Sequence, residues 1–246
     1  MLFIMLFSRH QTLFNMKIFS GILAASLSLA TVSNMEASLI DTEMPSSLFN
    51  LGLRAGINTS VHTFDSKFFN TWNINSWGTG FDAGVVFDIN LRRYLAIQPG
   101  FFFESRSGHY SYVHTFIDEN QDITPFSQLG HYRSYYFNIP VMVSLRFSLA
   151  DNVKWLVEAG PYLQLKLHSS DSENIDVFSG DTYDSPLPEQ AKANSSDFGL
   201  KLGSGILVND HYSFSIHYLA GMRDVWKKPF NGGRNKAWTF TVGYNF

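Results

Sequence analysis

After Pro45, apolar and polar residues alternate with a period of two in eight separate stretches. These stretches cover residues 49–57, 81–90, 95–106, 135–147, 154–167, 197–206, 213–223 and 238–246. Successive side chains of an extended strand point to opposite faces, so the pattern predicts eight strands whose two faces meet different environments. Several stretches are as long as the roughly 9–11 residues that a tilted strand needs to cross a bilayer, whereas soluble strands usually have about 5–6.

Two environments can produce this alternation. A soluble β-sandwich turns its apolar faces inward, whereas a membrane barrel turns them outward. The polar faces favour the barrel, because they mix opposite charges with many glycines, as a narrow lumen filled by side chains requires. The net charge of -3 gives no basic stripe for nucleic acid, and the absence of Cys excludes disulfides and thiolate chemistry.

The connections between the stretches provide a second test. Those at 91–94, 148–153 and 208–212 are short, whereas those at 58–77, 107–130, 168–194 and 225–236 are long. Short and long connections therefore alternate, as they do in barrels with periplasmic termini and turns. We predict an all-β fold, namely an eight-stranded antiparallel transmembrane up-and-down β-barrel with short periplasmic turns and four long extracellular loops.

The N-terminal segment has the features of a secretory signal. Lys17 precedes the apolar residues 18–32, and Ser33, Asn34 and Ala37 follow as a cleavage zone. We therefore predict a signal peptide over 1–37, of which 1–15 come from an upstream start because Met16 also suits initiation. A linker over 38–47 and a barrel domain over 48–246 follow. An uncleaved anchor is the alternative, but the apolar run is shorter than the ~20 residues of a spanning helix.

Charged residues recur on the polar faces of the stretches. They are Arg54, Asp82, Asp88, Glu104, Arg146, Glu158, Lys166 and Lys201. Eight strands leave an interior that side chains can just fill, and unpaired charges there would be costly. We predict that these residues form a structural network of salt bridges in the lumen. A small-solute channel is the weaker alternative.

The C-terminal sequence WTFTVGYNF carries apolar residues at every second position, namely Trp238, Phe240, Val242, Tyr244 and Phe246. It resembles the terminal strand that the barrel assembly machinery recognises in the bacterial outer membrane. The segments NLGLRAGIN, IQPGFFFESRSG and YYFNIPVMVSLRF resemble the PorT-like outer-membrane β-barrel family of Bacteroidetes, over about Ser47 to Phe246. The resemblance implies an integral outer-membrane location, contact with outer-membrane lipid and an assembly signal in the last strand. It also suggests a link to protein secretion.

Candidates for chemistry are sparse. His109, His114, Asp118 and His131 fall in or near the second long connection, and His168 precedes two serines as in part of a lipid A deacylase rim. The acidic residues of 171–189 lack the order of a dedicated calcium loop. We therefore predict no catalytic, cofactor or metal site, and a structural, binding or assembly role with an unidentified protein partner. A lipid-modifying or proteolytic barrel enzyme is the alternative from another class.

Overall fold

The computed structural model describes residues 39–63, 76–117, 123–171, 174–176, 182–183, 194–225 and 233–246. The predicted signal peptide over 1–37 lies outside these residues. Within them, no helix has the length and apolar character needed to cross a membrane. We describe the barrel unit, residues 40–246, by itself.

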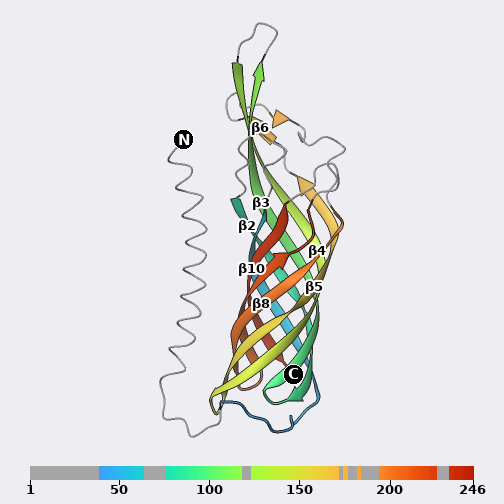
Figure 1. Cartoon of the computed structure of the whole chain (residues 1–246), viewed down its shortest axis with the longest axis vertical. Helices are drawn as coiled ribbons and strands as arrows, with labels where there is room; N and C mark the ends of the chain where they lie inside the picture. Colours follow the sequence, from blue (N-terminus) through green and yellow to red (C-terminus); the bar gives the residue numbers. More distant parts are fainter. Residues whose placement is uncertain are drawn as a thin grey trace. The chain divides into compact units, whose positions relative to one another are not determined.

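Eight long strands form the barrel (Figure 1). They are β1 (Phe49–Thr63), β2 (Ser76–Arg92), β3 (Leu95–Ile117), β4 (Ile123–Ala150), β5 (Val153–Asp171), β8 (Ser196–Val208), β9 (Tyr212–Gly221) and β10 (Arg234–Asn245). Two short strands, β6 (Asn174–Asp176) and β7 (Thr182–Tyr183), extend from β4. The order around the ring is β3-β2-β1-β10-β9-β8-β5-β4, and pairing of β3 with β4 closes it. The sheet is antiparallel throughout, as the alternation and the connection lengths predict.

The two faces of the wall differ as expected for a barrel in lipid. The outward side chains are large and apolar, and many are exposed, such as Ile57 at 66% and Phe240 at 46%. The inward side chains are largely polar, and Glu104, Asn138 and Gln164 are at most 1% exposed. Because the apolar side chains point away from the interior, lipid is the environment that stabilises them.

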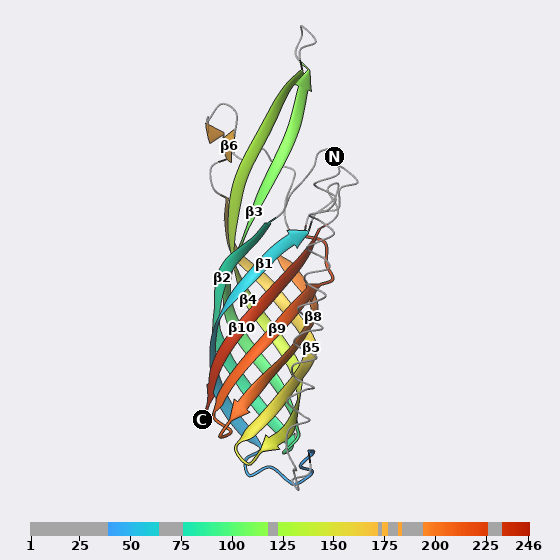
Figure 2. The ribbon, with the colours of Figure 1, turned by 90° about the vertical axis from the view of Figure 1, so that its left-hand side faces the viewer.

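Strands β3 and β4 are much longer than the sequence pattern indicates. The loop predicted over 107–130 is instead mostly strand, because pairing continues to Ile117 opposite Ile123. Figure 2 shows this green hairpin rising beyond the other strands. The alternation stops near Ser105 and Ser107 because an apolar outward face is needed only where the strand meets lipid. β3 and β4 therefore continue beyond the residues in which the apolar–polar alternation indicated a strand.

At the outer end of β2, two glycines allow the backbone of β3 to approach that of β2 closely. A side chain on Gly78 would overlap the backbone of Ser107, and one on Gly80 would overlap the carbonyl of Ser105. The β2–β3 register shifts by one residue between Trp77 and Asp82, which marks a bulge. Asn58 Nδ2 and Ser60 Oγ of β1 then donate to the carbonyl oxygens of Ser105 (3.0 Å) and Ser107 (2.9 Å). These contacts join β1 to β3 across the inner face of β2.

The turn between β8 and β9 is of the tight kind found in hairpins. Asn209 and Asp210 both adopt positive φ, at 54° and 60°, and His211 N donates to Val208 O at 3.1 Å. Consecutive left-handed residues define a two-residue type I′ turn, for which Asn and Asp are well suited. Lys154 Nζ lies 2.6 Å from Asp210 Oδ1, so this turn is also tied to the neighbouring β4–β5 turn.

The segment before β1 is tied to the β2–β3 turn. Arg93 lies 3.1 Å from Asp41 and 2.8 Å from Glu43 through ion pairs, and Asn90 N donates to Leu48 O at 2.8 Å. The backbone amide of Glu43 and the Arg93 guanidinium hold the pKa of Asp41 below its usual value. These ion pairs are exposed and hold the segment at the periplasmic rim without adding much stability.

Candidate functional site

A deeply buried polar cluster in the lumen surrounds Glu104 of β3. Its carboxylate accepts hydrogen bonds from Arg106 Nη2 at 2.6 Å, Asn138 Nδ2 at 2.5 Å and Gln164 Nε2 at 3.0 Å. Glu104 and Arg106 are each only 1% exposed. The Arg106 guanidinium also lies over the Tyr136 ring, 5.7 Å from its centre. The cluster therefore links β3, β4 and β5 across the interior and fills it.

A second cluster, nearer the periplasmic end, is built on Asp88 of β2. Arg146 Nη2 donates to Asp88 Oδ2 at 2.8 Å, and Gln98 Nε2 donates to Asp88 Oδ1 at 2.7 Å. Arg146 Nη1 also donates to Asn90 Oδ1 at 2.9 Å. Asp88 with Arg146 is an ion pair between two of the eight charged residues predicted for the lumen.

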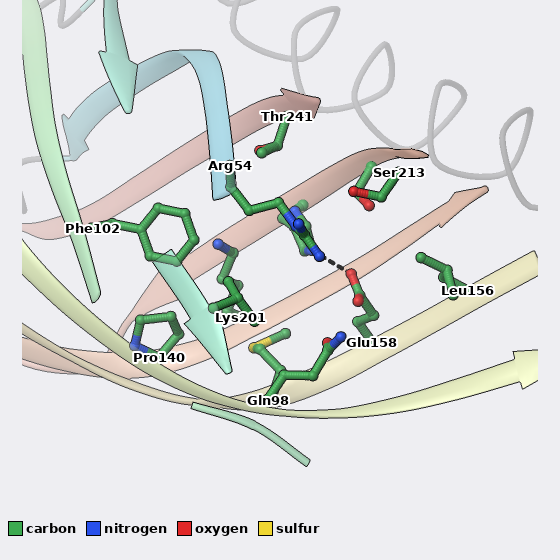
Figure 3. Close-up of a pocket in the computed structure, with 13 residues that line it drawn as sticks. Arg54, Gln98, Phe102, Pro140, Leu156, Glu158, Lys201, Ser213 and Thr241 are labelled. Carbon is green, nitrogen blue, oxygen red and sulfur yellow. Dashed lines mark hydrogen bonds and ion pairs between the residues drawn. The ribbon is translucent and has the colours of Figure 1, made fainter. Parts of the chain in front are cut away.

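Between the clusters lies a small cavity, shown in Figure 3. Glu158 Oε2 is 2.7 Å from His217 Nε2, and Arg54, Lys201 and Phe102 also line this space. Its volume is about 40 Å³. Ligand pockets usually measure roughly 300–1,000 Å³, whereas a cavity needs only about 10–15 Å³ of such space to hold one water. The cavity can hold a little water but no organic substrate.

The other predicted lumen residues also lie on the inner face. Arg54 Nη2 donates to Asn245 Oδ1 at 2.6 Å. Lys201 Nζ lies 5.1 Å from the centre of the Phe102 ring, and Lys166 Nζ lies 6.0 Å from that of Tyr136. Asp82 is 4% exposed, and within the described residues its Oδ1 has no hydrogen-bond partner.

Several residues of the network were not identified from the sequence. Arg106 is the ion-pair partner of Glu104, His217 is a hydrogen-bond partner of Glu158, and Asp197 accepts hydrogen bonds from Tyr162 and Asn235. Their positions on the polar faces were visible in the alternation. The alternation did not show which residues these side chains contact, because the contacts depend on the stagger between strands that are distant in sequence.

The residues predicted as the assembly signal share the outward face of β10. Trp238, Phe240 and Tyr244 lie opposite Thr59, Ile57 and Leu53 of β1, where the barrel closes. Trp238 also contacts Tyr218 of β9, with ring centres 4.8 Å apart, and Phe246 N donates to Leu51 O. In the folded barrel these side chains therefore belong to the seam between the first and last strands.

Among the candidate catalytic histidines, the structure describes the side chains of His109, His131 and His168. His109 and His131 are cross-strand partners with ring centres 6.1 Å apart, and both are exposed on the outer face. His168 lies opposite Tyr135, away from that pair in the register. The side chain of His114 and the whole of Asp118 lie outside the description. Within the described residues, no group of three or more His, Asp or Glu side chains is placed to hold a metal.

Solved structures similar to this chain include small outer-membrane proteins. Ail of Yersinia pestis, solved with the heparin analogue sucrose octasulfate, has 13% identity and a TM-score of 0.38, covering 81% of this chain and 100% of Ail. Neisserial surface protein A has 10% identity and a TM-score of 0.40, covering 80% and 97%. OprG of Pseudomonas aeruginosa has 11% identity and a TM-score of 0.41, covering 84% and 99%.

A family model also matches most of the chain. The model described as "Outer membrane protein beta-barrel domain" matches residues 34–227. No curated protein sequence matches the chain significantly. The matched range includes the strands β1 to β9 and every charged residue of the predicted lumen network.

Proposed function

Because the chain belongs to the outer membrane protein beta-barrel domain family, and is thus an integral protein of the bacterial outer membrane, we propose that it is a non-enzymatic binding barrel. In this proposal the barrel is closed to solutes. It presents the long β3–β4 hairpin to a partner outside the membrane.

The filled lumen supports closure. Glu104, Arg106, Asn138 and Gln164 lie across the interior with exposures of 1% or less, and hydrogen bonds to Glu104 hold them in place. A conducting path would need either a continuous water column or movement of these side chains. Moving them would separate a buried ion pair, which is costly.

We therefore expect no stepwise conductance from the purified, refolded barrel in planar lipid bilayers. Liposomes containing it should not take up small sugars, because the hydrogen-bonded cluster around Glu104 lies across the lumen. A general porin reconstituted in the same way is the positive control. Reproducible conductance steps from the wild-type barrel would contradict closure and favour the small-solute channel.

The hairpin supports a binding role. The β2–β3 ladder ends at Ser76 opposite His109, whereas β3 continues to pair with β4 as far as Ile117. The barrel wall itself does not require this extension, since β8 and β9 span with 13 and 10 residues. An extension of this length offers backbone edges to a partner, apart from Gln128 and Leu129, where β4 already pairs with β6. Extended strands are common recognition surfaces. This extension is the observation that carries the proposal.

Replacing residues 110–130 by Asn-Gly tests whether the β3–β4 hairpin is the binding surface. His109 and His131 already pair, so a two-residue turn can join them and leave the wall intact. We expect the variant to retain heat-modifiable gel migration but to fail to restore the phenotype of a deletion strain. Full complementation by the folded variant would show that the hairpin is not the binding surface.

The resemblance to the PorT-like family supports a finer proposal, namely that the partner takes part in protein secretion. Candidate partners during biogenesis are the barrel assembly machinery, through Trp238 to Phe246, and outer-membrane lipid along the apolar face. We also propose the domain division 1–37, 38–47 and 48–246, because the first segment has the features of a secretory signal and the alternation begins after Pro45. Secretion assays in the deletion strain test the secretion link, which is excluded if the secreted proteins are unchanged.

A further inference from the structure

A row of polar side chains lies on the outer surface of β3, β4 and β5, just beyond the apolar belt. It consists of His109, His131, Arg133 and His168, which we call the rim row. All four are exposed, and Arg133 alternates with the buried Tyr132 and Ser134. The cross-strand pairing of His109 with His131, and the position of Arg133 two residues further along β4, bring three of them together.

Aromatic rings lie directly below the rim row on the same face. Phe103 and Tyr135 are stacked with centres 5.8 Å apart, and Phe81 lies 6.1 Å from Phe103. Phe101 and Phe137 continue this aromatic surface, with ring centres 6.1 Å apart. Rings of this kind concentrate where a barrel wall passes from hydrocarbon to head groups. Arg133, two residues beyond Tyr135, is therefore placed at head-group depth.

In the described strands, the outward charges at this depth have one sign. In the described strands, the first charged outward residues above the belt are Arg133 on β4 and Lys236 with Arg234 on β10. The carboxylates Asp82, Asp88, Glu104, Glu158 and Asp197 are all buried inside the barrel. Among the described residues Arg133 makes no ion pair. Its side chain is exposed on the outer face, where it can meet a ligand from the membrane.

We propose that the rim row binds a phosphate group of the anionic glycolipid of the outer leaflet, with Arg133 as the principal contact and His109 and His131 as hydrogen-bond donors. A guanidinium matches phosphate with two parallel hydrogen bonds, and the aromatic surface below it suits the acyl chains of the same lipid. The ligand approaches from the side, so the site is independent of the hairpin tip and of any protein partner.

Native mass spectrometry of the detergent-released barrel with bisphosphorylated lipid A tests this site. We expect Arg133→Gln to weaken binding about tenfold, the size expected for lost charge-assisted hydrogen bonds. The affinity of Arg133→Lys for lipid A should lie between those of the wild type and Arg133→Gln, because lysine keeps the charge but cannot make two parallel hydrogen bonds. Lipid A from which both phosphates have been removed should bind the wild type as weakly as intact lipid A binds Arg133→Gln. Inorganic phosphate at equal concentration should not displace the lipid.

Lys236→Gln is the matched control. Lys236 is an outward cation two residues from Trp238, and β10 lies four strands from β4 in the ring of eight. The Lys236→Gln substitution removes the same charge at a similar depth on the opposite wall, and it should leave lipid A binding unchanged. Equal losses in both variants would mean that only overall charge matters, and unchanged binding by folded Arg133→Gln would also overturn the site. Heat-modifiable migration of each variant shows that the barrel is folded.

Discussion

Arg106→Met is expected to destabilise the barrel by about 3–5 kcal/mol, because it leaves Glu104 charged and buried without its ion-pair partner. Arg106 supplies both Nε and Nη2 to Glu104 Oε2, at 3.1 and 2.6 Å. Asp82 of β2 lies opposite Glu104 in the register, so the loss also removes a cation close to two neighbouring carboxylates. Urea unfolding in lipid vesicles, followed by heat-modifiable migration, measures the change.

Arg93→Met is the matched control for Arg106→Met. Replacing Arg93 by Met breaks ion pairs with Asp41 and Glu43 at the exposed periplasmic rim, where solvent already screens the charges. We expect little change in the free energy of unfolding. The double variant Glu104→Met with Arg106→Met should recover much of the stability lost in Arg106→Met, since no unpaired charge remains. Equal stability of Arg106→Met and Arg93→Met would contradict a structural role for the lumen cluster.

The parts of the fold that could be predicted follow from the contrast between lipid and lumen. Ile57 and Phe240 face lipid while Glu104 and Lys201 face the interior, and this contrast imposes the period of two along each strand. Outside the lipid the contrast disappears, so the sequence pattern could not indicate that β3 reaches Ile117. The family match and the closed ring both agree with the barrel that the alternation indicates.

The contacts inside the lumen were less accessible from the sequence. Placing Arg146 beside Asp88, or His217 beside Glu158, requires the stagger of strands separated by more than fifty residues. The stagger is set by turns and bulges, such as the one near Gly80, which single-sequence patterns do not show. Alternation therefore identifies which charges enter the lumen but does not pair them.

Gly80→Val should destabilise the barrel by about 2–5 kcal/mol, through overpacking and lost hydrogen bonds. A side chain there would overlap the carbonyl of Ser105 and lie 2.9 Å from Asn58 Oδ1. Because the obstacle is backbone, β3 must move away from β2, and the Asn58 and Ser60 bonds to β3 would be lost. Urea unfolding in vesicles measures the loss, and a slower appearance of the heat-modifiable band would report hindered closure.

Ala83→Val on the same strand separates this local overlap from a general effect of a larger residue in β2. Ala83 faces outward and is exposed, so the added methyl groups enter lipid rather than the wall. We expect its stability to remain within about 0.5 kcal/mol of the wild type. If Gly80→Val unfolds at the same urea concentration as Ala83→Val, then β3 does not depend on the glycine for its position. If only Gly80→Val is destabilised, close approach of the two backbones is what holds β3 at the outer end of the lumen.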